Sequence, residues 1–284
     1  MGVVLLLLVL ATRQGVLTES FHTRRFSRST SCRPRAAPLV AVDKRGPADD
    51  DWLSAFVKRF LPTPEDVGLT RYDRSSQPER YPCTKDEFAD LLPSDKKGSD
   101  AALLRQLLAK TNLETRELAL AYDANRDGWN AKSFHGKVDK KGPAVVLCRS
   151  ASGGVFGGYN PCGWVNYGEY RGSIAAFLFV FPDGDVKLRP VKLAKISGAG
   201  LAQIDDGQGP RFGSEGLTVV LERSRPRQVR CKLGLYYERL PDGGNSFLPG
   251  GAAQDELADL KVYVGVYAAG EKVPYDDAMP FSLN

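Results

Sequence analysis

The residues of this sequence that could do chemistry are few and far apart. Beyond residue 42 there is one histidine, His135, two residues after Ser133. Histidine can act as a general base toward a serine or cysteine, so a hydrolase or peroxide-handling enzyme would have to use His135 with Ser133, Cys148 or Cys162. The Gly-x-Ser-x-Gly motif that exposes a nucleophile in many hydrolases is absent from the sequence. Catalysis is therefore the alternative hypothesis, and a structural histidine beside Phe134 is the favoured interpretation.

An oxygen-rich turn is the second feature that could bind something. Residues 123–128 read Asp-Ala-Asn-Arg-Asp-Gly, which matches the first half of a calcium-binding loop. The twelfth position of such a loop must supply a bidentate carboxylate, and here that position is Phe134. We therefore expect no calcium. We predict instead a turn in which short polar side chains hydrogen-bond to the backbone.

Motifs for metals and nucleotides are weak throughout the sequence. Cys83, Cys148, Cys162 and Cys231 lack the paired spacing of a zinc site. Of these, Cys162 is expected to be the more exposed thiol and Cys148 to lie in the core. The glycine-rich segment 198–203 misses the third glycine of a dinucleotide fingerprint. We expect no metal and no cofactor.

Charge divides the chain into two parts. Residues 1–42 contain six arginines and one glutamate, so they carry the whole formal net charge of +5. Residues 43–284 contain 33 basic and 33 acidic residues. A neutral body gives no extended basic face, and we expect it to bind no nucleic acid and no anionic lipid surface.

The first 42 residues have the composition of a targeting leader. Residues 3–11 form an apolar run that suits a signal peptide and is shorter than the roughly 20 residues of a membrane-spanning helix. Residues 21–42 are rich in Arg, Ser and Thr and contain no acid. This order resembles the two-part presequence of complex plastids. We predict a plastid location, with no transmembrane segment in the mature chain; an ordinary secretory leader is the alternative.

A charged linker and a helical extension are expected between the leader and residue 118. Thr84 with Glu87, and Thr111 with Glu114, have the spacing of capping boxes, which begin helices. Between these two signals, leucines at helical spacing predict an amphipathic helix over about 100–110. This section would bury its apolar stripe against the domain that follows.

From residue 118 onward the pattern changes to short apolar or alternating runs separated by glycine turns, which is typical of strands. Six to eight antiparallel strands after a few helices predict an α+β fold, a two-sheet β-sandwich flanked by helices. The predicted strands cover residues 118–122, 144–150, 153–159, 173–181, 185–193, 217–222, 232–240 and 260–267, with a short helix over 133–138. The predicted parts of the chain are the leader 1–42, the linker and helical extension 43–117, the domain 118–268 and a C-terminal tail 269–284.

Several short stretches, taken in order, resemble the motifs of the TLDc domain family. They are residues 127–135 (DGWNAKSFH), 142–150 (GPAVVLCRS), 153–164 (GGVFGGYNPCGW), 176–181 (AFLFVF), 209–217 (GPRFGSEGL), 233–237 (LGLYY) and 262–265 (VYVG). The positions that match the family motifs are Asp127, Gly128, Phe134, His135, Gly157, Gly158, Trp164, Phe212, Gly213 and Leu217. The section before residue 118 resembles the extension of a plant and algal branch of this family.

The resemblance implies a helix-flanked β-sandwich, an association with oxidative-stress resistance and the binding of other proteins, without an established catalytic mechanism. Several members bind the vacuolar proton-pumping ATPase, but a plastid address argues against that partner. The sequence departs from the family at Val138, where cysteine is frequent, and at Lys261, where an acid is frequent. We predict a non-catalytic interaction module with an unknown protein partner. The candidate contacts come from loops expected to be exposed and are Tyr159, Trp164, Tyr167 and Arg211.

Overall fold

The computed structural model describes residues 73–197, 204–205 and 209–276. The predicted leader, much of the linker and the glycine-rich segment 198–203 lie outside these residues, as does the end of the tail. The strands are β1 (Leu118–Asp123), β2 (Ala144–Ser150), β3 (Val155–Asn160), β4 (Glu169–Tyr170), β5 (Phe177–Phe181), β6 (Val191–Ala194), β7 (Ile204–Asp205), β8 (Arg211–Phe212), β9 (Leu217–Val219), β10 (Gln228–Cys231) and β11 (Gln254–Gly265). The helices are η1 (Pro78–Arg80), α2 (Asp100–Arg105), η2 (Gln106–Leu108), α3 (Ala124–Asp127), α4 (Ala131–Val138), η3 (Pro182–Gly184) and η4 (Pro249–Gly251).

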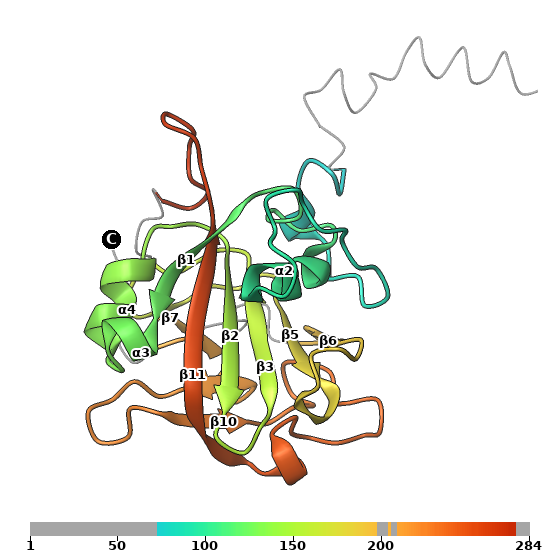
Figure 1. The fold of residues 1–284 in the computed structure, drawn as a ribbon, viewed down its shortest axis with the longest axis vertical. Helices are drawn as coiled ribbons and strands as arrows, with labels where there is room; N and C mark the ends of the chain where they lie inside the picture. Colours follow the sequence, from blue (N-terminus) through green and yellow to red (C-terminus); the bar gives the residue numbers. More distant parts are fainter. Residues whose placement is uncertain (1–72, 198–203, 206–208, 277–284) are drawn as a thin grey trace, which may run out of the picture. The chain divides into compact units, whose positions relative to one another are not determined.

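The strands form one antiparallel hydrogen-bonded path in the order β4-β7-β8-β9-β10-β11-β2-β3-β5-β6, and β1 also pairs with β11. Strand β11 belongs to both layers of the path. The first residues of β11, 254–256, pair with β10. From Leu257 onward β11 pairs with β2, with a shift in register between Leu257 and Asp259. Figure 1 shows β11 as one long strand beside β2. The predicted two-sheet sandwich is confirmed.

Strand β2 is buried on both faces, which explains its almost continuous apolar sequence. Val146 and Cys148 belong to a core that also contains Val219 of the second sheet. Val145 and Leu147 belong to a separate cluster, because successive side chains of a strand point to opposite faces. That second cluster is closed by leucines from α2 and η2.

The amphipathic helix predicted within the extension is present as α2, and the chain continues as η2. Ser99 caps it, since the Ser99 hydroxyl accepts a hydrogen bond from the backbone N–H of Ala102 at 3.2 Å. The side chains of Leu104, Leu107 and Leu108 are fully buried. In Figure 1, α2 lies beside β3 and β5, so this part of the extension packs on the sandwich of its own chain.

The helices predicted from the two capping-box signals are absent. The chain around Thr84 and Glu87 is irregular, and the Glu87 carboxylate pairs with the Lys110 ammonium at 2.8 Å instead of returning to the start of a helix. Thr111 and Glu114 lie in a turn, where the Glu114 carboxylate accepts a hydrogen bond from the backbone N–H of Lys110 at 2.8 Å. Both predictions were wrong, and in both places the glutamate that would have completed the capping box has another partner.

The strand predicted over 232–240 is also wrong. Gly234 has a φ of +93°, and its N–H donates to the carbonyl of Tyr237 at 2.8 Å, so the chain turns there. Only an isolated bridge between Lys195 and Tyr237 remains. Strand β10 was not predicted, because it is short and only two of its residues, Val229 and Cys231, are buried. The other two, Gln228 and Arg230, are polar.

Candidate functional site

His135 lies on α4, which begins at a well-formed cap: the Asn130 side chain accepts a hydrogen bond from the backbone N–H of Ser133 at 2.8 Å. The imidazole is buried, with 6% of the residue exposed. Its Nδ1 lies 2.9 Å from Oδ1 of Asp139, the residue that directly follows α4. Its ring packs edge-on against Phe134, with centroids 4.9 Å apart. This environment fits the interpretation of His135 as a structural residue.

The candidate nucleophiles lie in three different environments. Ser133 shares α4 with His135, but residues two apart on a helix project in different directions. Cys148 is fully buried on β2, among the core residues. Cys162 follows β3 and forms a hydrogen bond with Tyr275, near the C-terminal end of the described chain. The three candidates therefore come from three separate segments: α4, β2 and the turn after β3.

Cys162 is buried, so the expectation that it is the more exposed thiol was wrong. The turn after β3 is tied down by its own polar groups. The Asn160 side chain accepts from the N–H of Cys162 at 2.9 Å and donates to the carbonyl of Gly163 at 2.9 Å. Arg171 adds a hydrogen bond to the Cys162 carbonyl at 3.1 Å. These contacts close the loop over the thiol.

Of the four cysteines in the described part of the chain, Cys148, Cys162 and Cys231 are buried and Cys83 is partly exposed, and burial raises the pKa of each. It raises the pKa of Cys83 and of Cys231 to about 11. The thiolate is the reactive form of cysteine, so a raised pKa makes these side chains poor nucleophiles at neutral pH.

Four aromatic side chains from separate segments pack edge-on, each against the next. We call them the aromatic row: Tyr122, Phe134, Trp164 and Phe212. The ring centroids are 5.6 Å apart for Tyr122 and Phe134, 5.5 Å for Phe134 and Trp164, and 6.2 Å for Trp164 and Phe212. All four are buried. Three of the four match family motifs, so motifs that are distant in sequence meet at one packing centre.

Two of the motif glycines are required by close contacts. A Cβ on Gly157 would fall on the backbone carbonyl of Val146 in β2, and a Cβ on Gly158 would lie 2.7 Å from Cζ of Phe212. Gly157 therefore lets β2 and β3 approach each other, and Gly158 makes room for the end of the aromatic row. The φ angles of Gly128 (+96°) and Gly213 (+70°) also favour glycine.

The turn over 123–128 is held by side chain to backbone hydrogen bonds, as predicted. The Asp123 carboxylate accepts from the N–H of Asn125 at 3.0 Å, and the Asp127 carboxylate accepts from the N–H of Asp123 at 3.0 Å. The Arg126 guanidinium, together with this backbone bond, lowers the pKa of Asp127 to about 2. The Tyr122 hydroxyl donates to the carbonyl of Gly128 at 2.7 Å, which ties the turn to the aromatic row.

Two of the proposed partner contacts lie in the interior. Tyr159 and Trp164 are each 1% exposed, so the prediction that they lie on an exposed loop was wrong. Tyr159 packs on Phe177 inside the cluster covered by α2 and η2, and Trp164 sits in the aromatic row. Tyr167 and Arg211 are partly exposed, and their role in binding a partner stays a prediction.

A buried ion pair that fixes the extension was not predicted from the sequence. Arg105 is fully buried, and its Nε lies 2.8 Å from Oδ2 of Asp95, whose side chain is 3% exposed. The guanidinium also donates to the carbonyls of Leu113, Glu114 and Arg116. A signal existed, because Arg105 lies three residues before Leu108 and so shares the apolar face of the helix.

A second charged cluster, which was also not predicted, joins α2 to the sandwich. The Asp100 carboxylate accepts from Arg149 at 2.5 Å and from Lys261 at 2.9 Å, and Asp259 lies 3.1 Å from Arg149. Burial alone would raise the pKa of Asp100, but the hydrogen bonds from the two cations outweigh it and lower the pKa. Lys261, at the position where the family often has an acid, is therefore an internal partner of α2.

A buried amine makes a third polar contact between the extension and the sandwich. Lys192 on β6 is 3% exposed, and its Nζ donates to the carbonyls of Glu87 at 2.6 Å and Leu107 at 3.2 Å. The Phe88 ring lies 4.8 Å from the same nitrogen. Burial lowers the pKa of Lys192 to about 8.

The described surface carries a basic hairpin, which we define as residues 222–230, in the connection after β9 and the first residues of β10. Arg223, Arg225, Arg227 and Arg230 are all exposed there, with one acid, Glu222. The Arg227 guanidinium lies 4.7 Å from the centre of the Trp129 ring, beside the first family motif.

The residues that the structure describes contain no group of three or more His, Cys, Asp or Glu side chains placed to hold a metal ion. No helix among them is both long and apolar enough to cross a bilayer.

The fold and the aromatic row define a class of protein: a helix-flanked antiparallel β-sandwich whose sequence motifs form a packing centre. Residues 97–236 match the family model of the TLDc domain. The chain is therefore a TLDc-domain protein, as the sequence motifs predicted. TLDc domains occur in proteins of oxidative-stress resistance and generally serve as interaction modules. A comparison with curated proteins found no match.

Proposed function

We propose that this protein is a non-catalytic protein-interaction module that supports oxidative-stress protection in a plastid. The observation that carries the proposal is the state of the candidate catalytic groups. The four described thiols have raised pKa values, and the His135 ring is paired with Asp139, just after the end of its helix. A protein that handled peroxide with a cysteine would need an accessible thiol with a lowered pKa.

The basic hairpin is the surface that best suits a partner. Four exposed arginines within a body that is neutral overall give a local field that favours an acidic protein surface. Arginine and tryptophan are the side chains most often found at energetically important interface positions, and here Arg227 and Trp129 lie together.

Affinity capture tests this proposal. Tagged full-length protein is recovered from its native cells at moderate salt, and the retained proteins are quantified by mass spectrometry. We expect a stoichiometric partner that is lost from Arg223→Glu/Arg225→Glu and retained by Lys96→Glu/Lys97→Glu, which changes the charge equally at another exposed pair. Recovery of the protein alone under all salt conditions contradicts the interaction module. Equal retention by both variants contradicts the basic hairpin as the contact.

The plastid location rests on the composition of residues 1–42. A fluorescent protein fused behind these residues should enter the plastid of a cell with complex plastids. A fusion that begins at residue 21 should not, because it lacks the apolar run of a signal peptide. Secretion of the first fusion would contradict the plastid address and support the secretory alternative.

A further inference from the structure

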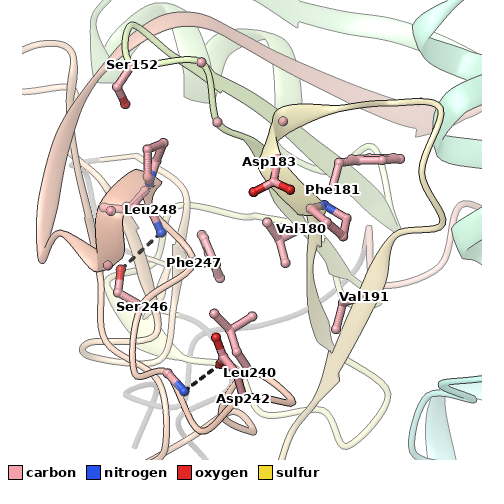
Figure 2. A pocket seen from close by; sticks show the side chains of 18 of the residues that line it. Ser152, Val180, Phe181, Asp183, Val191, Leu240, Asp242, Ser246, Phe247 and Leu248 are labelled. Carbon is pink, nitrogen blue, oxygen red and sulfur yellow. Dashed lines mark hydrogen bonds between the residues drawn. The ribbon is translucent and has the colours of Figure 1, made fainter.

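A cavity of about 720 Å³ opens between three loops that no part of the proposed function uses. Its walls are the turn between β2 and β3, the turn after β5 and the loop over 240–251 (Figure 2). The volume lies within the range of small-molecule sites, roughly 300–1,000 Å³. The candidate catalytic residues do not line it, and the part of the family motifs that does is the ends of the stretches 153–164 and 176–181.

The floor of this cavity is apolar and firmly packed. Val180, Phe247 and Leu248 line it and belong to one buried cluster of the fold. The Phe247 ring packs against the ring of Phe156 with centroids 5.1 Å apart, which fixes its position. A floor of this kind provides apolar and aromatic surface to a bound organic group without rearrangement.

The walls are held together by close backbone contacts. A Cβ on Gly184 would fall on the carbonyl oxygen of Gly153, so the turn after β5 touches the turn between β2 and β3. A Cβ on Gly154 would lie 2.9 Å from Cδ of Pro249, so the third loop touches the same turn. Because these loops interlock, the cavity is formed before anything binds, and binding costs little ordering entropy.

The ionisable side chains that line the cavity are both acidic, Asp183 and Asp242. Asp183 has a φ of +53°, a left-handed conformation that few residues other than glycine adopt. Asp242 is oriented by its own turn, since its Oδ1 accepts from the N–H of Gly244 at 2.9 Å. In the view of Figure 2, Val180 and Phe247 lie between the two carboxylates.

We propose that this cavity binds a small organic cation with an apolar body, such as an arylalkylamine. The apolar body would lie on Val180 and Phe247, and the ammonium group would pair with one of the two carboxylates, Asp183 or Asp242, at the ends of this apolar surface. An ammonium can form a charge-assisted hydrogen bond to either carboxylate, whereas an anion of the same size would be repelled by both. This inference is independent of the partner surface at the basic hairpin.

Titration calorimetry on the full-length protein tests the proposal with three matched probes: 2-phenylethylamine, 2-phenylethanol and 3-phenylpropionate. The amine is expected to bind about tenfold more tightly than the alcohol, the contribution of one hydrogen bond to a charged group. The propionate is expected not to bind. Equal binding of amine and alcohol, or no binding of the amine, overturns the proposal.

Two variants locate the cation. Asp183→Asn and Asp242→Asn keep the shape of the side chain, and asparagine tolerates the left-handed backbone of position 183. The double variant Asp183→Asn/Asp242→Asn is expected to weaken amine binding about tenfold while leaving alcohol binding unchanged, and the single variants show which carboxylate pairs with the ammonium. Asp185→Asn, an exposed carboxylate outside the cavity, is the control and should bind like the wild type. If the double variant fails to fold, the single variants decide the outcome; wild-type amine binding by the folded double variant, or by both single variants, overturns the proposal.

Discussion

The ring of Trp164 lies edge-on to the ring of Phe212, with centroids 6.2 Å apart, and joins two family motifs that are distant in the sequence. Gly158 leaves the space that Phe212 occupies. These motif positions therefore have a direct structural explanation: they build the contact between the two layers of the sandwich. A packing centre of this kind requires its residue types without any catalytic demand.

Trp164→Ala is expected to lower the free energy of unfolding by about 3–5 kcal/mol, because a fully buried tryptophan is replaced by a cavity. Tyr167→Ala, three residues later and partly exposed, should change it by less than about 1 kcal/mol. Chemical denaturation followed by circular dichroism measures both. Similar stability of the Trp164→Ala variant and the wild type would show that the aromatic row is not the packing centre.

Gly157→Ala should cost about 3 kcal/mol, since the added methyl group would overlap the carbonyl of Val146 and force β2 and β3 apart. Gly136→Ala is the matched control. Gly136 lies on α4 with nothing within 4 Å of an added Cβ, so alanine should stabilise the helix by about 1 kcal/mol. Opposite shifts in melting temperature are expected. A neutral Gly157→Ala would contradict the close approach of the two strands.

How far the sequence predicts the structure depends on whether a residue's surroundings are local. The strands β2 and β3 and the helix α4 were predicted because period, turn residues and caps lie within each segment. The burial of Tyr159 was not, because the cover comes from leucines of α2 and η2. The capping-box predictions failed in the same way, since the Glu87 carboxylate is bound to Lys110.

The candidate site follows the same rule. Sequence motifs identified the family residues, but only the fold shows that Phe134, Trp164 and Phe212 meet in one row. The position of Arg105 on the apolar face of its helix was a signal of burial, but its partner Asp95 could be identified only from the fold. The cavity next to Asp183 could not be predicted, because three loops that are distant in sequence form its walls.

Arg105→Met should destabilise the protein by about 3–5 kcal/mol, because it leaves the Asp95 carboxylate buried without its partner. Lys110→Met removes an ion pair with Glu87 in which both side chains are about half exposed, and should cost less than about 1 kcal/mol. Urea denaturation of the two variants compares a buried ion pair with an exposed one. Equal losses would contradict the role of Arg105 in fixing the extension.

Lys192 should give the protein a pH-dependent stability. Burial lowers its pKa to about 8 in the folded chain, from the ordinary lysine value of 10.5. Between these values the unfolded chain binds a proton that the folded chain has released, so this amine makes the free energy of unfolding rise with pH.

The measurement is the difference in free energy of unfolding between the wild type and Lys192→Met. From below pH 8 to pH 10.5 this difference should shift by about 1–3 kcal/mol in favour of the wild type. The exposed Lys187→Met serves as the control and should give a flat difference. A flat or falling curve for Lys192→Met would mean that the buried amine does not titrate as the fold implies.

Hydrogen peroxide consumption by the purified full-length protein, with dithiothreitol as reductant, is the sharpest test of a non-catalytic module. We expect the same rate as with dithiothreitol alone, because burial raises the pKa of the four described thiols and His135 is bound to Asp139. Cells that express a folded His135→Gln variant should accordingly survive peroxide as well as cells with the wild type. Catalytic turnover by the pure protein, lost in His135→Gln or in a cysteine variant, would contradict the interaction module and establish an enzyme.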